Sequence, residues 1–142
     1  MPIDFKIVTP YGVTYSDEIE KVSIPTTNGM ITVCERHAPL ISVLQSGEMN
    51  VHKVDGSTIN VAVSGGFLEI QSDSRVYIMA DTAERAEEID LSRAQDALKR
   101  AEELLKNEDK LADVDFALLQ AKIEKELARI HVGSKYREVH LN

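Results

Sequence analysis

The sequence contains very little cysteine and few aromatic residues. Its 142 residues include one cysteine, no tryptophan, three phenylalanines and four tyrosines. A single cysteine excludes an internal disulfide and is typical of a reducing compartment. Cys34 has only Arg36 and His37 as nearby basic residues, so we expect it to be a small buried side chain and not a nucleophile.

Positive charge and long apolar runs are also scarce. Sixteen basic and 24 acidic residues give a formal net charge of −8, which argues against nucleic-acid partners because these require a basic protein surface. No segment approaches the ~20 apolar residues of a membrane span, and the start MPIDFKIVTPYG lacks a signal-peptide pattern. We expect a soluble cytoplasmic protein with no direct membrane insertion.

Catalytic and metal-binding patterns are missing as well. The four histidines, His37, His52, His131 and His140, are dispersed without metal-ligand spacing, and there is no Walker-type phosphate loop. Ser64-Gly65-Gly66 lacks the flanking residues of a nucleophile elbow, and glycines within strands usually mark a bulge or tight corner. The sequence therefore predicts no catalytic residues, no metal site and no enzyme activity of the isolated chain.

The first part of the chain has the two-residue period of β-strands. Apolar residues alternate from Ile3 to Ala80, and turn signals recur about every ten residues, as in an all-β sandwich or barrel. We expect Ser64-Gly65-Gly66 to break the chain before a further strand at Phe67–Ile70.

After Ile89 the apolar residues follow a helical period. One stripe, with Asp90 as its expected N-cap, predicts a first amphipathic helix: Leu91, Ala94, Leu98, Ala101 and Leu105. A second stripe, with Asp113 as its expected cap, predicts another: Phe116, Leu119, Ile123, Leu127 and Ile130. A polar connection at Asn107–Lys110 separates them, Gly133 is expected to stop the second helix, and Ser134–Asn142 shows no pattern.

The predicted fold is therefore α+β, with an N-terminal antiparallel β-sandwich at residues 1–86 and a C-terminal antiparallel two-helix hairpin at 87–142. Both helices are rich in alanine, which allows their backbones to approach closely. A two-helix unit has only a thin core of its own. We therefore expect the hairpin either to dock on the β-domain or to lie against another protein, and a switch between the two is physically reasonable.

Four cations in the helices allow two readings. Arg93 and Arg100 are seven residues apart on one helix face, and Lys125 and Arg129 are four apart on the next. If the hairpin turns near residues 109–110, they line one flank, where guanidinium groups grip a polyphosphate. From spacing alone, an ordinary solvated face with carboxylate partners such as Asp90, Asp96, Glu124 and Glu126 is favoured.

With these residues in view, the whole chain resembles the epsilon subunit of bacterial ATP synthase, with both domains in the same order. Ser64–Ile70 is similar to that family's SGGxLEV stretch, and His37–Leu40 to its GHxPL loop. Ala80–Ala83 looks like the family's end of the sandwich, and Arg93–Glu102 looks like its RAxxAxxRAE helix.

The resemblance implies a non-catalytic subunit of the rotor's central stalk. In this family the sandwich binds the gamma subunit and touches the c ring, coupling proton flow to ATP synthesis. The hairpin either folds down on the sandwich or extends along gamma toward the alpha and beta subunits, where it inhibits ATP hydrolysis. The implied location is peripheral, at the cytoplasmic face of the cell membrane.

Some members of the family bind ATP through an I(L)DxxRA motif, which Ile89–Ala94 fits fully. The resemblance implies an ATP site on the first helix and its approach, made of Glu84, Ile89, Asp90, Arg93, Ala94 and Arg100. On the second helix Arg129 matches a family arginine, and Lys125 replaces another, keeping the charge without the bidentate fork. ATP is thus expected as a regulatory ligand, with no required cofactor and with the role of Mg²⁺ open.

The loop Gly29–His37 departs from the family's GELGIxPGH. Met30 replaces the acidic residue, Thr32 the second glycine, Glu35 the proline and Arg36 the glycine before the histidine. No binding role is carried over to Met30 or Arg36. The alternatives to a rotor subunit are a free-standing ATP-binding sensor or interaction module, and a hydrolytic enzyme.

Overall fold

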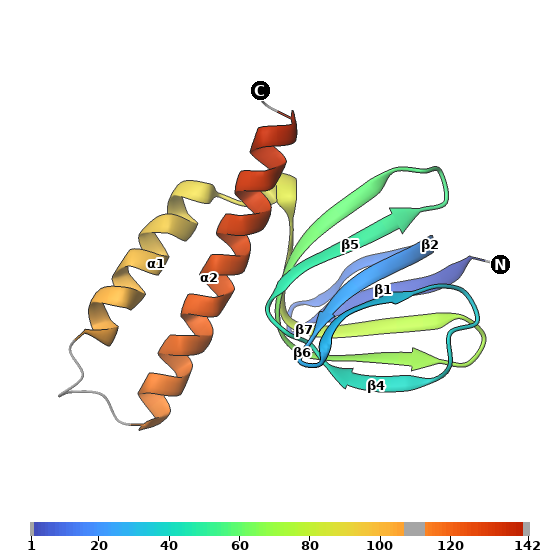
Figure 1. The fold of residues 1–142 in the computed structure, drawn as a ribbon, viewed down its shortest axis with the longest axis horizontal. Coiled ribbons are helices and arrows are strands. Elements are labelled where there is room, and N and C mark those ends of the chain that lie inside the picture. Colours follow the sequence, from blue (N-terminus) through green and yellow to red (C-terminus); the bar gives the residue numbers. More distant parts are fainter. Residues whose placement is uncertain (1, 107–112, 141–142) are drawn as a thin grey trace.

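The computed structural model describes residues 2–106 and 113–140, and it separates into a strand-built part and a pair of helices (Figure 1). Seven strands build the first part. They are β1 (Ile3–Thr9), β2 (Gly12–Thr26), β3 (Gly29–Val33), β4 (Leu40–Val43), β5 (Gly47–Lys53), β6 (Thr58–Gln71) and β7 (Arg75–Arg85).

The strands form one sheet that folds over itself into a sandwich. Their order is β1-β7-β6-β5-β2-β3, with β4 paired to β6 and β1 also paired to β2. The long strands β2 and β6 each serve both layers: β6 pairs with β5 as far as Val63 and with β4 from Phe67 onward. The predicted sandwich is confirmed, with one exception to its antiparallel pairing, because β1 and β7 run parallel.

The sandwich core follows the predicted two-residue alternation. Ile3, Phe5 and Ile7 are at most 1% exposed, whereas Asp4 between them is exposed. The cluster continues through Met49 on β5 and the inward residues of the remaining strands. At about 25 cal/mol per Å² of buried apolar surface, this cluster is the main stabilising contribution to the domain.

The glycines of Ser64-Gly65-Gly66 bend β6 but do not break it, contrary to the sequence-based expectation. β6 stays paired with β7 on both sides, with Ser64 opposite Thr82 and Gly66 opposite Ala80. Gly65 and Gly66 have φ angles of 61° and 98°. A Cβ on Gly66 would lie 1.9 Å from the Met79 carbonyl oxygen. The strand turns from one layer into the other here, and only glycine fits.

A short connection leads from the sandwich to the helices. The 3₁₀ turn η1 (Ala86–Glu88) precedes α1 (Leu91–Leu105), and α2 (Asp113–His140) follows. Asp90 caps α1 as predicted, because its Oδ1 accepts the Arg93 backbone N–H at 3.1 Å. The predicted connection at 107–110 and the side chain of Asp113 lie outside what the structure describes.

The helices pack through their small residues. Ala94, Ala97 and Ala101 are the buried residues of α1, while the leucines of its predicted stripe are only half-buried. On α2 Leu119 is buried, but Phe116 and Leu127 are exposed, which corrects the predicted stripe. The stripe assumed one contact face, whereas α2 contacts both α1 and the sandwich and lies between them (Figure 1).

The second helix does not stop at Gly133, so the predicted stop and the unpatterned tail were wrong. α2 continues to His140. Gly133 is buried, and a Cβ there would lie 3.2 Å from Ile89 Cγ2 and 3.4 Å from Leu91 Cδ1. The glycine therefore allows α2 to approach the start of α1 closely, and it does not end the helix.

We predict that Gly66→Ala lowers the free energy of unfolding by at least about 3 kcal/mol, because the methyl group overlaps a backbone carbonyl. Gly56→Ala is the matched control. Gly56 also has a positive φ, 90°, but open space around its Cβ position, so only backbone strain of about 1 kcal/mol applies. Urea unfolding of both variants measures the difference, and equal losses would contradict the steric explanation.

Candidate functional site at the sandwich-hairpin junction

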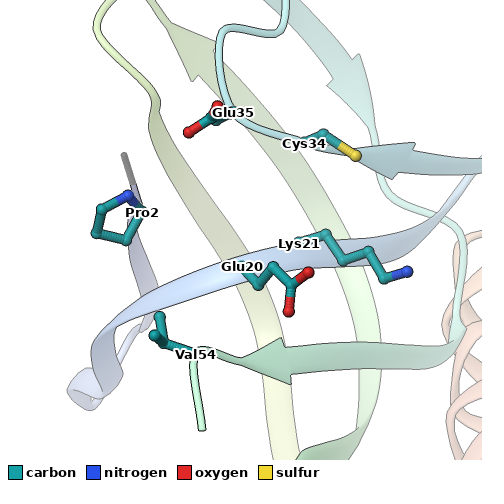
Figure 2. A pocket seen from close by; sticks show the side chains of 6 residues that line it. All are labelled: Pro2, Glu20, Lys21, Cys34, Glu35 and Val54. Carbon is teal, nitrogen blue, oxygen red and sulfur yellow. The ribbon is translucent and has the colours of Figure 1, made fainter. Parts of the chain in front are cut away.

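The sandwich carries one open cavity on strands away from the helices. It has a volume of about 440 Å³ and is lined by Pro2, Glu20, Lys21, Cys34, Glu35 and Val54 (Figure 2). Cys34 is exposed here, contrary to its predicted burial, because β3 ends at Val33 and the next residue leaves the core. The lining mixes one lysine with two carboxylates and shows no arrangement typical of nucleophilic catalysis.

The more structured site lies where α2 crosses the outer face of the sheet. Glu48 on β5, Ala62 on β6 and Glu84 on β7 stand side by side, because the register pairs Glu48 with Ala62 and Ala62 with Glu84. α2 contributes a partner at each step of this row. Lys135 bonds Glu48, Val132 packs near Ala62, and Arg129 bonds Glu84.

Arg129 bridges the two domains through Glu84 and also pairs with Glu126 on its own helix. Its Nε and Nη2 donate to the two oxygens of Glu84 at 2.7 and 3.4 Å, and its Nη1 donates to Glu126 Oε2 at 2.9 Å. Burial alone would lower the pKa of Arg129, but the bonds and charges of Glu84 and Glu126 outweigh it and raise the pKa above its ordinary value. The Arg129 guanidinium therefore stays charged and joins α2 to β7.

Lys125, one turn before Arg129, lines two cavities between α2 and the sandwich. One cavity, of about 290 Å³, also includes Glu84 and Arg129. The other, of about 390 Å³, includes Ser64 and Thr82, whose hydroxyls are hydrogen-bonded to each other. The walls of both cavities contain hydroxyl, carboxylate and ammonium groups alongside apolar surface.

The residues named for an ATP site fall into two groups. Glu84, Lys125 and Arg129 come together on the sandwich side of α2. Asp90 and Arg93 lie together at the start of α1, where Arg93 Nε is 3.5 Å from Asp90 Oδ2 and the arginine side chain is 85% exposed. Arg100 is exposed further along α1, which packs against α2, and the lining of neither Lys125 cavity includes Arg93 or Arg100.

The last two residues of the set have packing roles. Ala94 is fully buried on α1. Ile89 packs on the small cluster of Ala62, Ala86 and Val132 that joins the helices to the sandwich.

Sequence reasoning missed Glu48, whereas it named Glu84 as a candidate site residue and Glu126 as a carboxylate partner of the helical cations. Glu48 and Glu126 are 8% and 3% exposed, and Glu48 meets a lysine that follows it by 87 residues. The available signal was a carboxylate next to the apolar Met49 in a strand pattern, which gave no partner. Among residues 2–106 and 113–140, no group of three or more potential metal ligands occurs, and no helix is long and apolar enough to cross a membrane.

The comparisons with known proteins cover both parts of the chain. Residues 2–86 match the family described as ATP synthase, Delta/Epsilon chain, beta-sandwich domain, and residues 87–133 match its long alpha-helix domain. The ATP synthase epsilon chain of Chloroflexus aggregans is 42% identical over 137 residues, covering 96% of each chain. That of Herpetosiphon aurantiacus is 41% identical, covering 92% of this chain and 96% of the relative.

Solved structures share the fold at lower identity. A chain in the Euglena gracilis mitochondrial ATP synthase (OSCP/F1/c-ring) aligns with a TM-score of 0.74 at 21% identity, covering 94% of this chain and 81% of that one. A chain in the central stalk/c-ring structure from Tetrahymena thermophila aligns with a TM-score of 0.59 at 12% identity, covering 95% and 96%. Matches to both domains in order, and identity above 40% over nearly the full length, show that the chain belongs to the ATP synthase epsilon chain family.

Proposed function

We propose that the chain is a non-catalytic subunit of the rotor's central stalk, bound to the gamma subunit and the c ring, which couples proton-driven rotation to ATP synthesis. The observation that carries this proposal is the match of both domains, in order, to epsilon chains. The two solved relatives come from assemblies whose titles name the c ring. The corresponding location is peripheral, at the cytoplasmic face of the membrane.

The sandwich offers an apolar surface for such a partner. Ile41 and Val43 on β4 and Phe67 on β6 are 74%, 53% and 51% exposed, and Val43 is directly opposite Phe67 in the register. Alternation places all three side chains on the outer face. Clustered apolar side chains on an exposed sheet face are typical of a protein interface. We assign this surface to the gamma subunit.

We predict that Val43→Asp weakens binding to purified gamma subunit at least about tenfold, because it places a charge at the centre of an apolar interface. Val54→Asp is the control, since Val54 is 64% exposed in the turn after β5, where we place no contact. Co-purification and titration at micromolar concentrations measure both. Equal binding of the two variants would contradict the surface, and a parent chain that does not bind gamma would contradict the rotor role.

The hairpin is proposed to regulate ATP hydrolysis by leaving the sandwich. Its apolar contact with the sandwich is small, with Ala62, Ala86 and Val132 as the buried members. The remaining contacts named above are partly buried ion pairs of Arg129 and Lys135, whose attraction is offset by the loss of hydration that separation restores. An interface of this kind separates without unfolding either part. The extended hairpin would then reach the alpha and beta subunits and inhibit hydrolysis.

ATP is proposed as the ligand that stabilises the docked hairpin. Lys125 and Arg129 present two cations beside hydroxyl-lined cavities, and Arg93 is exposed at the capped start of α1. Phosphate oxygens would compete with Glu84 and Glu126 for Arg129. Arg93 and Arg100 would contribute from α1 after a rearrangement of their exposed side chains.

We predict that calorimetric titration of the isolated chain with ATP gives binding heat that Arg93→Ala abolishes. Lys125→Arg is the informative partner variant. It should tighten binding severalfold, because a guanidinium adds a bidentate fork for phosphate. An unchanged heat in Arg93→Ala would contradict the site. ATP binding without any affinity for gamma would instead favour a free-standing sensor, and turnover of ATP would favour a hydrolytic enzyme.

A further inference from the structure

Glu48 is a buried carboxylate with an incomplete set of partners. It lies on the outward face of β5, and α2 covers it so that its side chain is 7% exposed. Its Oε1 accepts a hydrogen bond from Lys135 Nζ at 3.0 Å. Its Oε2 is buried and has no hydrogen-bond partner among the described residues, although His131 Nε2 lies 3.7 Å away.

This arrangement makes hairpin docking depend on charge. A carboxylate that is removed from water loses its hydration, and only paired cations compensate for that loss. When α2 leaves the sheet, water solvates Glu48 and no cation is needed. Lys135 and His131 are 52% and 68% exposed even when docked, so neither is desolvated to the same extent. Docking therefore removes mainly Glu48 from water. The positive charge that α2 places beside it determines how far this loss of hydration is compensated.

His131 is the second α2 side chain near Glu48, with its Nε2 3.7 Å from Glu48 Oε2. The charged groups around it are Glu48 from β5, Lys135 and the Arg129–Glu126 pair from its own helix, and Glu84 from β7. Lys135 and Arg129 each pair with a carboxylate, whereas Glu48 Oε2 accepts no hydrogen bond from the described residues. The hydrogen-bonded cation that α2 supplies to Glu48 is therefore Lys135.

We propose that Glu48 and Lys135, with His131 beside the second oxygen of Glu48, form an electrostatic latch that sets the fraction of docked hairpin. The latch rests on the proposed release of the hairpin, and it adds the control of that release by residues outside the ATP set. Glu48 holds the hairpin only while α2 supplies positive charge. Loss of charge at position 135 releases it.

The docked fraction can be measured on the full chain with two spin labels. Cys34 is the one cysteine and is exposed on the sandwich. Gln95 is exposed on α1, so Gln95→Cys provides the second label. Pulsed double electron–electron resonance then resolves the docked and undocked distances, and their areas give the ratio of undocked to docked chains.

Lys135→Gln should raise that ratio on the order of tenfold, because it leaves a buried carboxylate unpaired. Glu48→Gln should not raise it, because the buried charge itself is gone. Adding Glu48→Gln to Lys135→Gln should therefore restore docking. Lys99→Gln, at an exposed position on α1, is the matched control and should leave the ratio unchanged. Equal undocking in Lys135→Gln and in the double variant would overturn the latch.

An undocked population that is measurable but indifferent to Lys135 overturns the latch alone, whereas no undocked population in any variant also overturns the switching hairpin.

Discussion

The structure depends on how one helix crosses the outer face of a sheet. At that crossing α2 meets Glu48, Ala62 and Glu84 on three adjacent strands. The small apolar contact at Ala62 lies between two charged contacts, one at Glu48 and one at Glu84. Apolar burial is insensitive to pH and salt at this scale, whereas ion pairs respond to both. Apolar burial stabilises the sandwich, whereas ion pairs of Arg129 and Lys135 contribute most of the polar contacts that position the hairpin on it. The two parts of the molecule thus have different physical sensitivities.

Much of this architecture was predictable from local pattern. The alternation from Ile3 to Ala80 specifies strands whatever their order, and Asp90 specifies the start of α1 through a bond to a backbone three residues away. These features depend on neighbours in sequence. The parallel pairing of β1 with β7 joins residues about 70 positions apart, as in Asp4 with Arg75, and no local pattern carries that information.

The failures of prediction share a physical cause. The conformational freedom of Gly133 predicts a helix end, but the residue lies within α2. Its lack of a side chain leaves room for Ile89 and Leu91. Free cysteines are usually buried, which predicts a buried Cys34. The residue is exposed because β3 ends just before it, at Val33. Spacing along each helix allows the four cations to share one flank of the hairpin, whereas Arg129 faces the sandwich and Arg93 lies at the start of α1. Tertiary packing decides which face of a helix is inside, and spacing alone does not.

The bend at Gly65 and Gly66 has a consequence for the geometry of any motion. β6 carries Ala62 under the hairpin on one side of the bend and Phe67 on the apolar surface on the other. One continuous strand, paired with β7 on both sides of the bend, therefore joins the docking position of the hairpin to the proposed partner surface. The position at which the hairpin docks is therefore fixed relative to the proposed partner surface, because both lie on the same strand.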